Sequence, residues 1–123
     1  MTAKPLHFIG SCKDDLSELP DDVKSSAGYA LWLAQIGTKH PKAKPLQGFK
    51  GASVQEVVID EDGDSYRVVY TVRFEHAVYG LHAFQKKSKK GIETPQKDIE
   101  LVRQRLGAAA EHHRKTYEKG EDK

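Results

Sequence analysis

Cysteine and long apolar runs are both scarce in this sequence. One cysteine, Cys12, stands among 123 residues, so the chain cannot form an internal disulfide, and it lacks the several thiols of a zinc ribbon or knuckle. No apolar run approaches the roughly 18 residues that a membrane-spanning helix needs. Residues 1–15 also lack the long apolar stretch of a secretory signal peptide. We therefore expect a cytoplasmic protein that makes no membrane contact.

Patterns typical of bound metals or nucleotide cofactors are missing as well. The acidic run at residues 60–64 does not fit a calcium-binding EF-hand loop, which needs glycine at its sixth position and glutamate at its twelfth, where Ser65 and Thr71 stand. The six histidines do not have the spacing of zinc ligands. There is no glycine-rich phosphate loop and no serine or cysteine nucleophile motif. We predict neither a metal nor a cofactor.

Charge is plentiful, and it is segregated along the chain. The net charge is only +2, but Lys39 to Lys50 contains four lysines and no acid, and residues 85–90 read QKKSKK. Acidic residues gather instead at 14–22 and 60–64. Such segregation favours a polyanionic partner on one side of the molecule, whereas the simpler alternative is that the lysines only solvate loops.

Hydrophobic periodicity predicts an α+β fold, with a strand, two helical pieces, an antiparallel meander of three strands and a terminal helix in that order. We expect one folded domain over residues 1–123, with a frayed tail at about 118–123. The expected elements are a strand at 6–9, helices at 13–19 and 21–36 ending at Gly37, a lysine-rich loop at 39–50, strands at 54–59 and 66–74 joined by an Asp62-Gly63 turn, a strand at 77–84, and a helix at 95–117 capped by Thr94.

Alternation along the strand 66–74 predicts two unlike faces. One face is expected to be core and the other more polar, with Tyr66, Val68, Tyr70, Val72 and Phe74 on the first and Arg67, Val69, Thr71 and Arg73 on the second. The end of the next strand brings Lys86 and Lys87 toward the polar face.

Cleavage of RNA by its own 2′-hydroxyl needs a base, an acid and a cation that stabilises the phosphorane. Arg67, Arg73, Lys86 and Lys87 are placed to supply the cations. The structural alternative is that Arg67 only forms a salt bridge with Glu56 on the neighbouring strand.

Several segments together resemble the phage-derived HigB-like branch of the RelE/ParE toxin superfamily. They are VQEVVI with Glu56, YRVVY with Arg67, LHAFQKKSKKG, and the Thr94-Pro95 helix start followed by Arg103 and Arg105. The likeness runs from about Phe8 to Leu106. It implies a RelE-like fold, in which N-terminal helices and a C-terminal helix pack on a mainly antiparallel sheet. It also implies the toxin of a type II toxin-antitoxin pair, acting as a ribosome-dependent endoribonuclease on mRNA. Its implied partners are the ribosome, mRNA and a cognate helix-turn-helix antitoxin.

The resemblance also implies functional residues. Arg67 matches the arginine that contacts the scissile phosphate in RelE-like toxins, and Lys86 or Lys87 matches a basic residue after the last strand. The predicted catalytic set is Glu56, Arg67, Lys86 and Lys87, and the predicted RNA-binding set is Lys50, Arg73, Lys89 and Lys90. The sequence departs from the family pattern at Val58, which stands where these toxins carry a cation.

Alternatives to nuclease activity stay open at this point. The chain is either a nuclease, a noncatalytic RNA- or protein-binding member of the superfamily, or a poison of gyrase. The antitoxin either covers Arg67 and the lysine cluster at residues 86–90 or docks on the helices at 13–36. The sequence does not choose between these docking modes.

Overall fold

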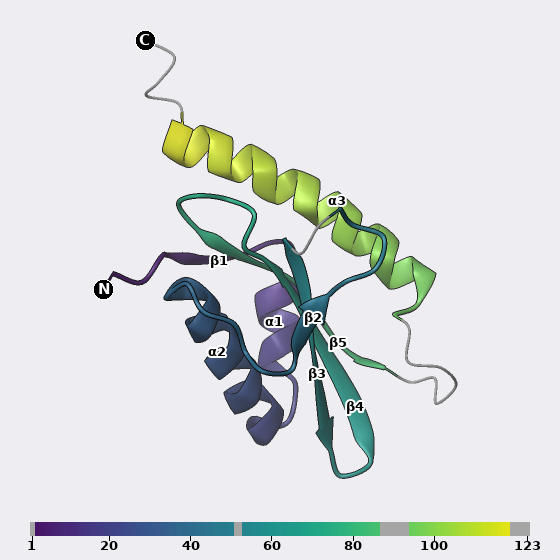
Figure 1. Ribbon diagram of the computed structural model, residues 1–123. Helices are drawn as coiled ribbons and strands as arrows, with labels where there is room; N and C mark the ends of the chain where they lie inside the picture. Colours follow the sequence, from purple (N-terminus) through teal and green to yellow (C-terminus); the bar gives the residue numbers. More distant parts are fainter. Residues whose placement is uncertain (1, 51–52, 87–93, 119–123) are drawn as a thin grey trace.

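The computed structural model describes residues 2–50, 53–86 and 94–118 (Figure 1). Its elements in chain order are β1 (Leu6–Phe8), α1 (Cys12–Ser17), α2 (Asp21–Gln35), β2 (Ala43–Pro45), β3 (Val54–Glu61), β4 (Asp64–Thr71), β5 (Val78–Lys86), α3 (Gln96–His113) and a π-helical turn at Arg114–Glu118. Among these described helices, none is both long enough and apolar enough to cross a bilayer.

The strands form one five-stranded sheet in the order β1-β5-β4-β3-β2. Only β1 and β5 pair in parallel, and the other pairs are antiparallel. Helices α1 and α2 pack against one face of the sheet and α3 crosses the other face (Figure 1). The predicted α+β class with a mainly antiparallel sheet is confirmed.

Each face of the sheet has its own hydrophobic core. On the α2 side, alternate residues of β4 pack with Val23, Ala27 and Leu31, which follow the spacing of a helical stripe. On the α3 side, the stripe Ile99, Val102, Leu106 and Ala109 packs on Val54, Val69 and Leu81. Every residue of β4 from Tyr66 to Thr71 is therefore buried. The face predicted to be the more polar one is buried beneath α3 because that helix supplies a second apolar layer.

A hairpin turn and a helix end form where the sequence predicts them. Asp62 and Gly63 have positive φ angles of 51° and 85°, the geometry of a tight hairpin turn that joins β3 to β4. Gly37, with φ 85°, follows α2, and the Thr38 N–H donates to the Leu33 carbonyl at 2.9 Å, which satisfies one of the last carbonyls of that helix.

Three expectations about local structure are wrong. The lysine-rich segment is not all loop, because Ala43–Pro45 pairs with β3 as an edge strand. Strand β4 ends at Thr71, so Val72 is 39% exposed, and Phe74 packs in the α3-side core and not with Tyr66. Thr94 does not cap α3, because its hydroxyl bonds to side chains of the sheet.

Candidate functional site

Strand register places a row of charged residues on the sheet face beneath the start of α3. Lys44 of β2 lies directly opposite Glu56 of β3. Arg67 of β4 lies diagonal to Glu56, because Val58 pairs with Arg67 and Glu56 pairs with Val69. Since alternate residues share a face, the three charged side chains project to the same side.

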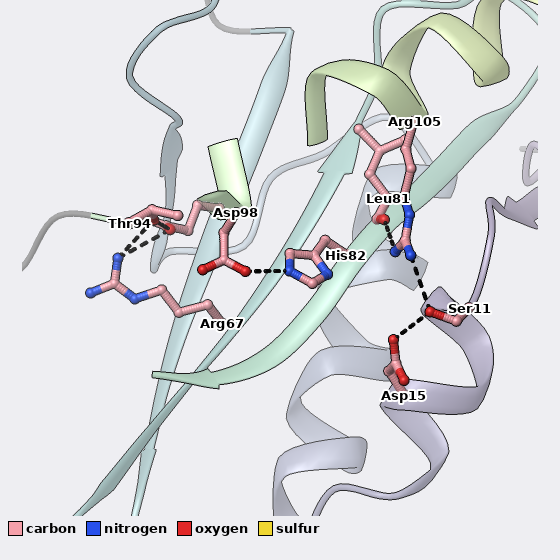
Figure 2. A network of polar contacts seen from close by, with 9 residues as sticks. Ser11, Asp15, Arg67, Leu81, His82, Thr94, Asp98 and Arg105 are labelled. Carbon is pink, nitrogen blue, oxygen red and sulfur yellow. Dashed lines mark hydrogen bonds and ion pairs between the residues drawn. The ribbon is translucent and has the colours of Figure 1, made fainter. Parts of the chain in front are cut away.

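The row is held by short polar contacts. Arg67 Nη1 lies 3.1 Å from Glu56 Oε2 and donates to Thr94 Oγ1 at 3.0 Å. The Thr94 hydroxyl also donates to Glu56 Oε2. Lys44 Nζ lies 4.0 Å from the other carboxylate oxygen, Oε1. Figure 2 shows the guanidinium of Arg67 directed at Thr94, at the entry to α3.

Burial differs sharply along this row. Arg67 and Glu56 are each only 3% exposed, whereas the side chain of Lys44 is 49% exposed. The Arg67–Glu56 salt bridge that was the structural alternative for Arg67 is therefore formed, and it is almost fully buried. A buried charge of either sign needs such a partner.

A cavity of about 410 Å³ opens beside the row, between β2, the segment after it and the start of α3. Its lining includes Lys44, Glu56, Thr94 and Arg103, together with Pro45, Leu46, Gln47, Gly48, Gln96 and Ile99. Arg67 is not in the lining, but it bonds to Glu56 and Thr94, which are. Among the residues that the structure describes, the cations lining the cavity are Lys44 and Arg103.

Arg103 is positioned by the segment that closes the cavity. Its Nη2 donates to the Gly48 carbonyl at 3.1 Å, and its guanidinium lies 4.8 Å from the centre of the Phe49 ring. The N-terminus of α3 also borders the cavity through Gln96. A helix N-terminus carries partial positive charge and unpaired N–H groups, so it adds to the attraction for an anion.

The predicted site residues separate into three groups. Glu56, Arg67 and Lys86 share the α3-side face, since Lys86 ends β5 opposite Ser65 and is buried. Arg73 follows β4 and is exposed, as is Lys50 in the segment between β2 and β3, so neither belongs to the row. The remaining predicted residues lie outside the described residues, namely Lys87, Lys89 and Lys90.

A second polar pair lies on the same side of the sheet. His82 Nε2 and Asp98 Oδ1 are 2.7 Å apart, and both residues are buried (Figure 2). The ring of His82 stacks on Phe84 at 4.5 Å. This pair anchors the first turn of α3 to β5 and so fixes the helix end that borders the cavity.

A third contact joins the middle of α3 to the sheet and to α1. Arg105 donates to the Leu81 carbonyl at 2.9 Å and to Ser11 Oγ at 3.0 Å, and Ser11 in turn donates to Asp15 (Figure 2). Arg105 thus positions α3 and is not among the residues that line the cavity.

Sequence reasoning missed Arg103 and Thr94 as parts of the site and counted Lys44 only among loop lysines. The pairing of β2 with β3 brings Lys44 to Glu56, and a three-residue strand has no periodicity from which this pairing follows. Among the residues that the structure describes, no three His, Cys, Asp or Glu side chains gather as metal ligands.

Residues 14–107, more than half of the chain, match the family described as "Phage derived protein Gp49-like (DUF891)". The chain belongs to this Gp49-like family. No curated protein matches the sequence.

Among solved structures, the Gp49-like chain is similar to an E. coli RelE toxin mutant in the free state, with 15% identity and a TM-score of 0.56 over 87% of this chain and 98% of RelE. A second match is the RelBE2 toxin-antitoxin complex from Mycobacterium tuberculosis, with 22% identity and a TM-score of 0.42 over 72% of this chain and 97% of the other. The likeness to RelE shows that the fold is RelE-like, which confirms the predicted fold. Membership of the Gp49-like family confirms the predicted phage-derived branch.

Proposed function

We propose that this protein is the toxin of a type II toxin-antitoxin pair and that it cuts ribosome-bound mRNA. Membership of the phage-derived Gp49-like family and a fold shared with the toxin RelE support a toxin. The observation that carries the proposal of RNA cleavage is the cavity in which Glu56 lies beside Lys44, with Arg103 and the N-terminus of α3 at its border.

The side chains of the cavity fit attack by a 2′-hydroxyl on its own phosphodiester. Lys44 and Arg103 hold the phosphate and offset the negative charge that builds on the phosphorane. Glu56 accepts the proton of the attacking 2′-hydroxyl. The 2′-oxygen then bonds to phosphorus, the bond to the 5′-oxygen breaks, and a 2′,3′-cyclic phosphate is left. Lys86 and Lys87, which belong to the predicted catalytic set, act in this proposal as supporting cations or as the proton donor for the leaving 5′-oxygen.

Arg67 acts in this proposal by one of two routes. In the free protein its guanidinium is held by Glu56 and Thr94. The first route is direct contact with the scissile phosphate, which requires that the guanidinium leave Glu56. The second route is to orient Glu56, which requires no rearrangement because Arg67 already holds one oxygen of that carboxylate.

The test is cleavage of translated mRNA and growth arrest after induced expression. Removing one preorganised donor costs roughly 100-fold in rate, so Lys44→Ala and Arg103→Ala should each slow cleavage by about that factor. Lys13→Ala, an equal change of charge on the exposed side of α1, is the matched control and should cut normally. If both cavity variants cut mRNA as fast as wild type, the proposed site is wrong.

One observation favours a second candidate, a noncatalytic RNA-binding protein. Arg67 and Glu56 are almost fully buried and bonded to each other, as in a structural ion pair. In that case the wild-type protein should bind RNA without leaving cleaved ends. Sequencing of RNA ends after induction separates the two candidates.

The proposed partner that silences the protein is a helix-turn-helix antitoxin. Direct masking would place its carboxylates against the cavity cations, because buried charges must be paired. Docking on α1 and α2 would block ribosome entry sterically. Hydrogen exchange on the complex distinguishes them. Protection at the cavity segments 44–48 and 94–103, or at 66–90, supports masking, and protection confined to 13–36 rules it out.

A further inference from the structure

The outer face of α2 exposes two large aromatic side chains. Tyr29 is 54% and Trp32 is 50% exposed, and their rings stack with centroids 6.2 Å apart and planes inclined by 24°. The spacing of three residues puts both on one side of the helix. His40, in the segment after α2, lies edge-on to Tyr29 at 5.7 Å. We call Tyr29, Trp32 and His40 the α2 patch.

The chain segment that contains the α2 patch has no acidic residue. Between Val23 and Gln55 the sequence contains no Asp or Glu but five lysines, at positions 24, 39, 42, 44 and 50. Lys39 and Lys42 flank His40, and both are exposed. In the part of the chain that the structure describes, neither takes part in an ion pair, whereas Lys24 pairs with Asp21 at 3.2 Å.

We propose that the α2 patch binds single-stranded RNA. Unpaired bases stack on the rings of Tyr29 and Trp32, and the phosphates between them contact Lys39 and Lys42. Aromatic rings beside lysines are the usual means by which proteins hold single strands, because every base has a π-face. The core of a protein-protein interface is instead depleted of lysine, so the two flanking lysines favour RNA over a protein partner.

The α2 patch lies close to the cavity along the chain. His40 and Lys44 are four residues apart, so their Cα atoms are separated by at most about 14 Å. Lys44 lies in β2, an edge strand of the sheet, and His40 lies three residues before that strand begins. An RNA strand held in the cavity therefore has a short path to the α2 patch. This continuity rests on the proposed function, whereas RNA binding by the patch does not.

The test uses the fluorescence of Trp32, the one tryptophan of the chain. Titration with a single-stranded RNA of about ten nucleotides should quench it, because a stacked base contacts the indole ring. Trp32→Ala should weaken binding about ten-fold, while Trp32→Phe should keep most of the affinity. Gln104→Ala, on the exposed side of α3, is the control and should bind as wild type.

Two further measurements locate the contact. Trp32→Ala should not alter binding of a duplex RNA, whose bases are already stacked on each other. Lys39→Ala with Lys42→Ala should make the binding of single strands less dependent on salt, since each lost phosphate contact lowers the slope by about 0.7.

The α2 patch proposal is overturned if single-stranded RNA leaves Trp32 fluorescence unchanged or if Trp32→Ala binds as tightly as wild type. The proposed function fails in a different way. Quenching by RNA without cleavage of mRNA contradicts the nuclease and leaves the patch intact, and cleavage without quenching does the reverse.

Discussion

Breaking the buried pair between Arg67 and Glu56 is expected to lower stability substantially. Arg67→Met leaves the Glu56 carboxylate, only 3% exposed, with Lys44 Nζ at 4.0 Å and the Thr94 hydroxyl as its contacts. Removing one member of a buried ion pair typically costs about 3–5 kcal/mol. Because Lys44 still offers partial compensation, we expect the lower end of this range, about 3 kcal/mol.

A double-mutant cycle measured by urea unfolding tests this reasoning. Glu56→Gln keeps the shape of the side chain and removes its charge. The double variant should lose about 2 kcal/mol less than the two single losses added, because it leaves no uncompensated carboxylate. Lys24→Ala, which breaks an exposed pair with Asp21, is the control and should cost under about 1 kcal/mol. Strict additivity of the two core substitutions would refute the argument.

The same variants separate folding from function at Arg67. At a temperature where circular dichroism shows Arg67→Met fully folded, we expect cleavage to be at least about 100-fold slower than wild type. If the folded variant arrests growth and cuts mRNA normally, Arg67 belongs to the core alone.

Three other predictions concern residues outside the cavity. Arg105→Ala removes the hydrogen bonds to the Leu81 carbonyl and to Ser11, and it should lower the free energy of unfolding, measured in urea, by about 1–3 kcal/mol. An unchanged value would mean that apolar packing alone fixes α3. Burial raises the pKa of the Cys12 thiol to about 12, so maleimide should label it only as fast as the protein unfolds, and rapid labelling of native protein would contradict this. Burial, reinforced by the histidines at 112 and 113, lowers the pKa of His7 below 6.5. The unfolded chain therefore binds that proton more readily, and stability should fall as pH drops below about 6.5, with a smaller fall of Tm in His7→Gln.

Elements with local signals were predictable from the sequence. The Asp62-Gly63 turn requires two positive φ angles that these residues tolerate, and the flanking alternation fixes the hairpin register. The spacing of Ile99, Val102 and Leu106 likewise predicts the buried side of α3. In each case the residues that decide the structure lie within a few positions of one another.

Features that depend on distant partners were not predictable. Thr94 is a good capping residue by its position, but its hydroxyl bonds to Glu56 and Arg67, which are 38 and 27 residues away. Strand β2 forms by pairing with the edge of β3, and no pattern within residues 43–45 predicts this pairing. The site combines both cases, since Arg67 follows from the strand pattern and Lys44 and Arg103 follow only from the assembled fold.

The two oxygens of Glu56 explain why a buried arginine and an exposed lysine belong to one site. Oε2 is held by Arg67 and Thr94, while Oε1 is the oxygen that Lys44 approaches. Arg67 and Thr94 therefore fix the carboxylate through one oxygen, and the other oxygen faces Lys44. In the proposed mechanism, a phosphate drawn in by Lys44 arrives beside a proton acceptor whose orientation is already set. On the second of the two proposed routes, loss of Arg67 acts through the orientation of Glu56, whereas loss of Lys44 acts directly on the phosphate.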